Sequence, residues 1–340
     1  NIPQTVVYTV TPTSGAAGNC VGATFTVTVT VSPKPTVANE TTSVCSRSAF
    51  TVTPTTGNGN IIAASTTYSW AIPVMESGIT GGAAGLAASN LTSISGTLIN
   101  STNAPLKATY TVTPKSGVCN GAPFTVEVTV NPKPEIPAQT ATICSGTAFP
   151  FVLANASPTA ATIIPVNTTY TWTVATNINV TGQSAQPTPQ SNISQTLTNL
   201  TNTAQNVVYT VTPVSGAQGL CPGANFTITV TVNPKPYVSA QTASACSGAA
   251  FSVSPANATV NNHIVPTGTT YTWTVEDNVN VTGDVNQAVG QSTIGQTLNN
   301  LTNTTQTVVY TVTPTSGTAG NCVGETFILT VSVYPKPFVT

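Results

Sequence analysis

Short runs in which apolar and polar residues alternate dominate the chain. The clearest runs from Phe25 to Val31, and close copies begin at Phe124, Phe226 and Phe327. A period of two places every apolar side chain on one face, as in a strand whose sheet is buried on one side. Pairs such as Ser-Gly and Asn-Gly mark turns between the runs, and no helical period of 3.6 is apparent. The pattern predicts an all-β fold of short antiparallel strands.

The strand pattern repeats along the chain. The segment YTVTP begins at Tyr8, Tyr110, Tyr209 and Tyr310, at spacings of 102, 99 and 101 residues. Each copy continues to a Cys-x-Gly motif, an alternating run and Pro-Lys-Pro. About seven short strands in roughly 100 residues are typical of a β-sandwich, here repeated as beads on a string. We therefore expect the C-terminal part of a preceding repeat at 1–35, followed by three repeats at 36–134, 135–236 and 237–340.

The Pro-Lys-Pro segments mark the joints between repeats. Proline fixes φ and favours extended backbone, so these segments predict short, stiff linkers. The linker residues are Pro33, Lys34, Pro35, Pro132, Lys133, Pro134, Pro234, Lys235 and Pro236.

Aromatic residues recur at fixed positions of the repeat, which predicts core packing between the two sheets. The predicted core aromatics are Trp70, Trp172, Trp273, Tyr110, Tyr209 and Tyr310.

Seven cysteines alternate between spacings of 25 and about 75 residues. Two pairings respect the repeat. Pairing within repeats joins Cys45 to Cys119, Cys144 to Cys221 and Cys246 to Cys322, and leaves Cys20 for a partner upstream. Pairing across boundaries joins Cys20 to Cys45, Cys119 to Cys144 and Cys221 to Cys246. Because a strand, a linker and a second strand separate the boundary pairs, the limit of about 7 Å between Cα atoms favours pairing within repeats.

Composition excludes several classes of function. Only 4% of residues are charged and the formal net charge is −1, so no basic face exists to attract nucleic acid. No apolar stretch is long enough for a transmembrane helix. Threonine accounts for 68 of the 340 residues, which favours strands with an uncharged, hydrated outer face.

No set of catalytic or metal-binding residues recurs with the repeat. His263 is the only histidine, and Glu276, Asp277 and Asp284 cluster in the last repeat alone. We interpret them as loop residues, and expect no enzyme activity, no catalytic or metal site and no cofactor. Asn-x-Ser/Thr triplets, such as those at Asn199 and Asn300, do not by themselves establish glycosylation.

The ordered motifs Cys-Ser-Gly, Tyr-x-Trp, Tyr-Thr-Val-Thr-Pro, Cys-x-Gly and Pro-Lys-Pro resemble a known family. The whole chain is similar to the PKD-like, immunoglobulin-like repeats of giant surface proteins of Bacteroidota. That resemblance implies export by the type IX secretion system and a role in adhesion, including gliding motility. Two features depart from related domains: the Asp-Phe-Gly-Asp segment of classical PKD modules is absent after Trp70, Trp172 and Trp273, and Cys119 follows Tyr110 by nine residues rather than two.

These observations predict an extracellular, cell-surface stalk that holds an adhesive tip away from the cell. One alternative is a self-assembling extracellular filament with contacts between copies. The other is an array of carbohydrate-binding modules, for which surface polysaccharide is the partner. The expected partners of the stalk are neighbouring repeats of the same chain, with no nucleic acid.

Overall fold

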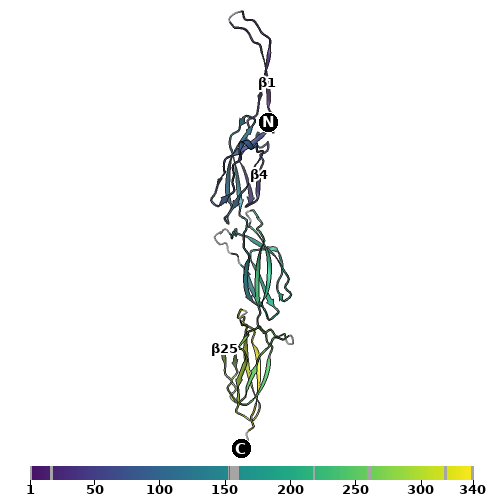
Figure 1. Cartoon of the computed structure of the whole chain (residues 1–340), viewed down its shortest axis with the longest axis vertical. Helices are drawn as coiled ribbons and strands as arrows, with labels where there is room; N and C mark the ends of the chain where they lie inside the picture. Colours follow the sequence, from purple (N-terminus) through teal and green to yellow (C-terminus); the bar gives the residue numbers. More distant parts are fainter. Residues whose placement is uncertain are drawn as a thin grey trace. The chain divides into compact units, whose positions relative to one another are not determined.

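The computed structural model describes residues 2–15, 18–151, 153, 161–216, 219–258, 262–317 and 320–337. It confirms the predicted all-β, immunoglobulin-like fold (Figure 1). The chain forms two compact units, and the division passes through the middle repeat. Unit 1 comprises Asn1–Ile136, Ala154–Thr169 and Pro213–Ala224. Unit 2 comprises Pro137–Leu153, Tyr170–Thr212 and Asn225–Thr340.

Unit 1 contains the sandwich of the first repeat. One sheet has the order β11-β10-β12-β3, with β5 and β6 also paired to β10, and the facing strands form the pairs β4-β8 and β7-β9. The 3-10 turn η1 covers Ala87–Ser89. The strands are β3 (Glu40–Cys45), β4 (Ala49–Val52), β5 (Thr66–Trp70), β6 (Val74–Met75), β7 (Ile79–Thr80), β8 (Ile94–Thr97), β9 (Ile99–Asn100), β10 (Leu106–Ser116), β11 (Cys119–Asn120) and β12 (Phe124–Asn131).

The sheet order recurs in the following repeats. The middle repeat forms β13-β20-β19-β15-β17 against β14-β18-β16. Its strands are β13 (Gln139–Cys144), β14 (Thr147–Phe151), β15 (Thr169–Val174), β16 (Val180–Thr181), β17 (Gln186–Gln190), β18 (Ile193–Asn199), β19 (Gln205–Val214) and β20 (Phe226–Asn233).

The third repeat forms β21-β29-β28-β23-β25 against β22-β26 and β24-β27. Its strands are β21 (Gln241–Cys246), β22 (Ala250–Val253), β23 (Thr270–Val275), β24 (Val281–Thr282), β25 (Gln287–Gln291), β26 (Ile294–Thr297), β27 (Asn299–Asn300), β28 (Gln306–Thr315) and β29 (Phe327–Tyr334).

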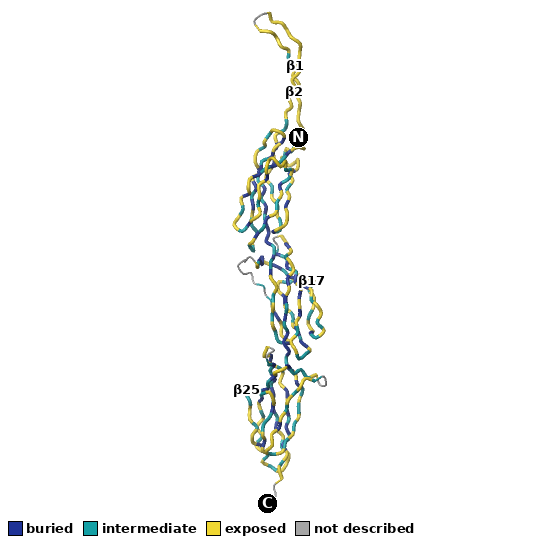
Figure 2. Tube along the Cα trace, viewed as in Figure 1, coloured by how far each residue is buried: buried dark blue, intermediate teal, exposed yellow. Residues whose placement is uncertain are grey.

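The N-terminal segment is a hairpin of two strands, β1 (Gln4–Val10) and β2 (Phe25–Val31). Its sequence matches the last two long strands of each repeat. Those strands have a buried face in the complete sandwiches, whereas the hairpin is exposed along most of its length (Figure 2). Tyr8 is 55% exposed and Phe25 is 52% exposed. The hairpin therefore presents an apolar face that other strands cover in a complete repeat.

The first strand of each repeat runs parallel to the last strand. β3 pairs with β12, β13 with β20 and β21 with β29, while the neighbouring pairings are antiparallel. The first strand ends at a cysteine beside the final residue of the last strand. The pairs are Cys45 with Asn131, Cys144 with Asn233 and Cys246 with Tyr334. We call this end of each sandwich, where the chain leaves for the next linker, the trailing end.

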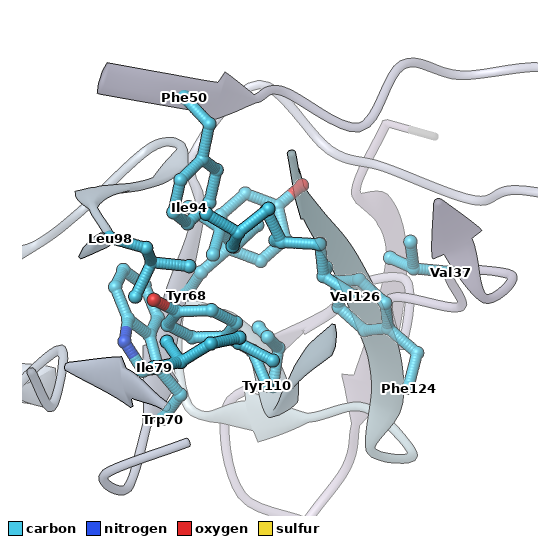
Figure 3. Close-up of a cluster of buried hydrophobic side chains, with 14 residues drawn as sticks. Val37, Phe50, Tyr68, Trp70, Ile79, Ile94, Leu98, Tyr110, Phe124 and Val126 are labelled. Carbon is cyan, nitrogen blue, oxygen red and sulfur yellow. The ribbon is translucent and has the colours of Figure 1, made fainter. Parts of the chain in front are cut away.

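The predicted aromatics are buried in all three repeats. In the first repeat, Trp70 and Tyr110 lie in the core between the two sheets (Figure 3). In the first repeat, the rings of Phe50 and Trp70 contact Tyr110 edge-on, with centroids 5.4 and 6.3 Å away. The indole N–H of Trp70 donates to the carbonyl of Ala83 at 3.0 Å. This bond satisfies the polar atom of the indole while its ring stays buried. Trp172 and Trp273 are buried in the same way, with bonds to Ser184 and Val285.

The tyrosines that begin the YTVTP segments, Tyr110, Tyr209 and Tyr310, share one position in the sandwich but differ in hydrogen bonding. The hydroxyl of Tyr209 donates to Gln195 Oε1 at 2.7 Å, and that of Tyr310 to Gln296 Oε1 at 2.9 Å. In the first repeat the glutamine is replaced by Gly96, and the buried hydroxyl of Tyr110 has no partner among the described residues. Burial raises the pKa of the Tyr209 hydroxyl above its ordinary value, so the hydroxyl stays neutral.

An asparagine closes the trailing end of each sandwich, and it is buried in the first two repeats and half-buried in the third. Asn199 donates to the carbonyls of Val232 at 2.8 Å and Thr203 at 2.7 Å. Its Oδ1 accepts from both the N–H and the hydroxyl of Thr201 at 2.8 Å. Asn100 and Asn300 make the same bonds in the other repeats. These Asn-x-Thr triplets are thus internal hydrogen-bonding motifs whose amides are already engaged.

The tyrosine difference predicts opposite effects of one substitution. Tyr209→Phe removes an existing hydrogen bond and leaves Gln195 Oε1 without that donor. We therefore expect the substitution to destabilise the fold by about 1 kcal/mol. Tyr110→Phe removes a hydroxyl that has lost its hydration without compensation, so we expect a neutral or stabilising effect. Denaturant unfolding of the two variants measures the difference, and equal losses would contradict this account.

The asparagine network predicts a larger loss. Asn199→Ala leaves the carbonyl of Val232 and the N–H of Thr201 without their partner, so we expect a loss of about 1–3 kcal/mol. Asn192→Ala is the matched control, because Asn192 also begins an Asn-x-Ser triplet but is exposed. Thermal unfolding of both variants is the measurement. A control as damaging as Asn199→Ala would show that burial of the amide is not the cause.

Candidate functional site: the disulfide joints between repeats

Two disulfides join consecutive repeats. In unit 1, Cys45 at the trailing end of the first repeat bonds Cys221, in the loop after β19. In unit 2, Cys144 at the trailing end of the middle repeat bonds Cys322, in the loop after β28. The Cα–Cα distance is 5.6 Å in both, across sequence separations of 176 and 178 residues. Each bridge thus links the first cysteine of one repeat to the second cysteine of the next.

This connectivity corrects the predicted pairing. Pairing within repeats is wrong for Cys45–Cys119, Cys144–Cys221 and Cys246–Cys322. The boundary pairing is also wrong, since Cys20, Cys119 and Cys246 are free thiols.

The parallel first strand explains the error. In the first repeat, Cys45 lies beside Asn131 at the end of β12, whereas Cys119 precedes the start of β12 at Phe124. An eight-residue strand spans roughly 25 Å, well beyond the reach of a disulfide. The third repeat repeats this arrangement, with Cys246 beside Tyr334 and Cys322 before Phe327. The two cysteines of one sandwich therefore lie at opposite ends.

The loop that carries Cys221 has a defined shape, and we call such a loop a cysteine loop. Ser215 Oγ accepts the N–H of Cys221 at 2.9 Å, and Gly223 donates to the carbonyl of Pro213 at 2.8 Å. Gly219 and Leu220 have φ values of +103° and +47°, in the left-handed region that favours glycine. A Cβ at Gly219 would lie 2.5 Å from Asn131 Nδ2. The loop therefore fits directly onto the trailing end of the first repeat.

The Cys-x-Gly motif makes room for the linker. A Cβ at Gly223 would lie 2.5 Å from the carbonyl oxygen of Pro134, in the Pro-Lys-Pro segment. Pro132 and Pro134 are buried, and Lys133 is half-buried. The linker is thus packed against the cysteine loop, which restricts it beyond the effect of proline alone.

An ion pair adds to the joint in unit 1. Arg47, two residues after Cys45, pairs with Glu135, which follows the linker. Glu135 also forms a two-bond bridge with Ile163, at 2.9 and 2.8 Å. Arg47 has a φ of +66°, where the corresponding residues are Gly146 and Gly248. Because the Arg47 side chain is 54% exposed, the pair contributes at most about 1 kcal/mol, comparable to the cost of this backbone conformation.

The joint in unit 2 has the same design. Ser316 Oγ accepts the N–H of Cys322 at 2.8 Å, and a Cβ at Gly320 would lie 2.2 Å from Asn233 Nδ2. Pro234 and Pro236 are buried, and a Cβ at Gly324 would clash with the carbonyl oxygen of Pro236. The repeated asparagine before Pro-Lys-Pro and the glycine before the second cysteine were visible in the sequence. Their proximity depends on the parallel strand pairing, which the alternation of residues does not reveal.

A cavity of about 350 Å³ lies beside the joint in unit 1. Its lining includes Pro105, Pro132 and Val166. Ser215 also lines it, but its hydroxyl already accepts the Cys221 N–H. Among the described residues that line the cavity, none is a His, Cys, Asp, Glu or Lys.

The isolated polar residues singled out in the sequence have local structural contacts. His263 shares a hydrogen bond of 2.8 Å with Ser239, and Asp284 accepts the N–H of Asn278 at 3.1 Å. Among the described residues, no group of three or more His, Cys, Asp or Glu side chains is placed to hold a metal ion. No helix in the described part of the chain is long and apolar enough to span a membrane.

Several solved structures are similar to this chain at low sequence identity. The I67–I69 fragment of titin is similar at 10% identity and a TM-score of 0.34, covering 89% of this chain and 97% of the fragment. Drosophila N-cadherin EC1-4 has 13% identity and a TM-score of 0.26, covering 98% of this chain and 84% of its own. The human Desmocollin-1 ectodomain has 10% identity and a TM-score of 0.26, with 97% and 68% covered. No curated protein matches the chain.

The fold and the joints define a tandem array of β-sandwiches linked by disulfides. The model of the PKD-like domain matches residues 1–35, 42–134, 141–236 and 243–337. The chain belongs to the PKD-like domain family.

The disulfide connectivity is directly testable by peptide mapping. Cleavage after aromatic residues places each of the seven cysteines on a different peptide. We expect the oxidised, thiol-blocked protein to yield the pairs Cys45–Cys221 and Cys144–Cys322, with Cys20, Cys119 and Cys246 carrying the blocking group. A Cys45–Cys119 peptide from the native protein would contradict the joint described above.

Proposed function

We propose that this chain is a tension-resisting segment of an extracellular stalk, which holds the adhesive part of a surface protein away from the cell. The observation that carries the proposal is the pair of disulfides that join consecutive repeats. A bridge within one sandwich stabilises only that sandwich. A bridge between sandwiches also transmits tension past the linker, which is useful in a tether and has no value for catalysis.

The two bridges overlap along the chain. The loop closed by Cys45 and Cys221 contains Cys144, and the loop closed by Cys144 and Cys322 contains Cys221. The shortest covalent route from Asn1 to Thr340 runs to Cys45, crosses to Cys221, returns to Cys144 and crosses to Cys322. It uses 139 of the 339 backbone steps. Tension on the ends therefore cannot extend most of the chain, even when the sandwiches unfold.

Several features support the location and source. Disulfides form and persist in oxidising compartments such as the cell exterior. The resemblance of the ordered motifs to repeats of giant Bacteroidota surface proteins supports export by the type IX system and attachment to an adhesin. The uncharged, threonine-rich surface suits an exposed tether, because a surface with few charged groups changes little in its interactions when the salt concentration or the pH changes.

A filament of many copies is the second candidate. The uncharged, threonine-rich surface favours it, because strand edges that carry no charge can pair with strands of another molecule. The carbohydrate-binding alternative has less support. Trp70, Trp172 and Trp273 are at most 8% exposed, so their rings offer no platform for stacking on sugars.

Single-molecule stretching tests whether the bridges limit the extension of the chain under tension. At about 3.5 Å per residue, the fully unfolded oxidised chain should reach about 500 Å and the reduced chain about 1,200 Å. The overlap of the bridges gives a sharper signature. Cys45→Ser should add only 22 residues of extensible chain, whereas Cys45→Ser with Cys144→Ser should add 200.

The size of the single-variant step decides the outcome. If the disulfides instead joined the two cysteines of each repeat, Cys45→Ser would add 74 residues of extensible chain, which is the separation of Cys45 and Cys119. An oxidised chain that extends as far as the reduced chain would remove the mechanical basis of the proposal. Cys119→Ser is the matched control, because Cys119 is free and its replacement should leave the extension unchanged.

A further inference from the structure

The backbone enters and leaves each sandwich through two neighbouring strands that run in the same direction. β3 pairs with β12, β13 with β20 and β21 with β29, each over six residues. The rest of the repeat lies between these two strands in the sequence. In the middle repeat it comprises β14 to β19 and includes Trp172 and Tyr209 of the core.

The first bridge connects the first strand of one repeat to the last strand of the next. From Lys34 the backbone runs through β3 to Cys45 in 11 steps, and the disulfide crosses to Cys221. From Cys221 it runs through β20 to Lys235 in 14 steps. This covalent route, which we call line A, takes 25 backbone steps, whereas the chain between the same two lysines takes 201.

The second bridge forms an equivalent route one repeat further along. Eleven steps lead from Lys133 through β13 to Cys144, and 14 steps lead from Cys322 through β29 to Lys336. This route, which we call line B, also takes 25 backbone steps, against 203 along the chain.

The two lines meet in the middle sandwich. There β20 belongs to line A and β13 to line B, and the two strands form a parallel ladder that pairs Gln139–Cys144 with the residues from Ile228 to Asn233. The bonds of a parallel ladder are evenly spaced, so a pull along the strands loads all of them together. The ladder therefore links the two lines sideways without being part of either route.

Neither line depends on the remainder of the sandwich. A pull on Lys34 and Lys235 is transmitted by peptide bonds and one disulfide, whereas the sandwich around them is held by hydrogen bonds and apolar contacts that are individually weak. A strand already rises about 3.3 Å per residue, close to the limit of about 3.5 Å for extended chain. The strands of each line therefore have little slack.

We propose that tension passes through the folded array along lines A and B, so that the sandwiches stay folded while the array is pulled. This inference rests on the proposed stalk function and names the strands that carry the tension within it. Residues 145–220 of the middle repeat lie outside both lines. The core that they build holds the two lines together and does not itself resist the extension.

Handles placed in the linkers test each line separately. In one protein, residues with an attachable side chain replace Lys34 and Lys235, at the ends of line A. In the other they replace Lys133 and Lys336, at the ends of line B. Single oxidised, folded molecules are pulled between the two handles. We expect no domain-unfolding step in either protein, because no sandwich has to open before its line is taut.

Two serine variants should give a reciprocal pattern. With the handles of line A, Cys45→Ser should add 172 residues of extensible chain, about 600 Å, and Cys144→Ser should add none. With the handles of line B, Cys144→Ser should add 178 residues and Cys45→Ser none. Each variant is its own folding control, since the line that it leaves intact should stretch as in the unmodified protein.

Two results would overturn the proposal. Unfolding steps between the handles of an intact line would show that the sandwich opens before the line bears the tension. Lengthening of both lines by either single substitution would show that the lines are not separate routes. The stalk function is tested apart from this, by the extension between Asn1 and Thr340. An end-to-end extension limited to about 500 Å, together with unfolding steps in line A, would retain the stalk and reject the lines.

Discussion

The parallel pairing of the first and last strands organises each repeat. This pairing carries the first cysteine to the end of the sandwich where the chain departs, beside the asparagine that precedes Pro-Lys-Pro. Without it, the two cysteines of a repeat would be candidates for one another. With it, the nearest loop that can receive Cys45 belongs to the next repeat. The connectivity of the array is therefore a consequence of strand direction within a single domain.

The joint and the core make different demands on the sequence. The core depends on apolar volume, and its aromatic contacts recur with small changes, such as the tilted pair of Phe149 and Tyr209 at 5.4 Å. The joint depends on a few close approaches. Gly219 on Asn131 and Gly223 on Pro134 leave no space for a side chain. In the chain-entropy model, a disulfide that closes so long a loop contributes about 5 kcal/mol to the stability of the folded state. The close fit at the joint thus occurs together with a large constraint on the unfolded chain.

Sequence patterns predicted the fold well and the joint poorly. The period of two, the repeated tyrosine and the Pro-Lys-Pro segments identify strands, repeats and linkers because each is a local signal. The burial of Trp70 and its counterparts follows from the same periodicity. Strand direction is not local: Gln139–Cys144 has the same alternation whether it runs parallel or antiparallel to its neighbour. Both pairings predicted from the cysteine spacing join cysteines that are neighbours in the sequence, whereas the partner of Cys45 lies one repeat further along.

The separation of the bonded cysteines also governs how such a chain is made. A chain that emerges from its N-terminus exposes Cys45 long before Cys221, because 176 residues separate them. The first repeat must therefore acquire its sandwich from hydrophobic burial and hydrogen bonds alone, with Cys45 still reduced. The Cys45 thiol can form its disulfide only when the cysteine loop of the next repeat has formed. Each joint disulfide therefore forms only after the following repeat has folded, so the order of disulfide formation follows the order in which the domains fold.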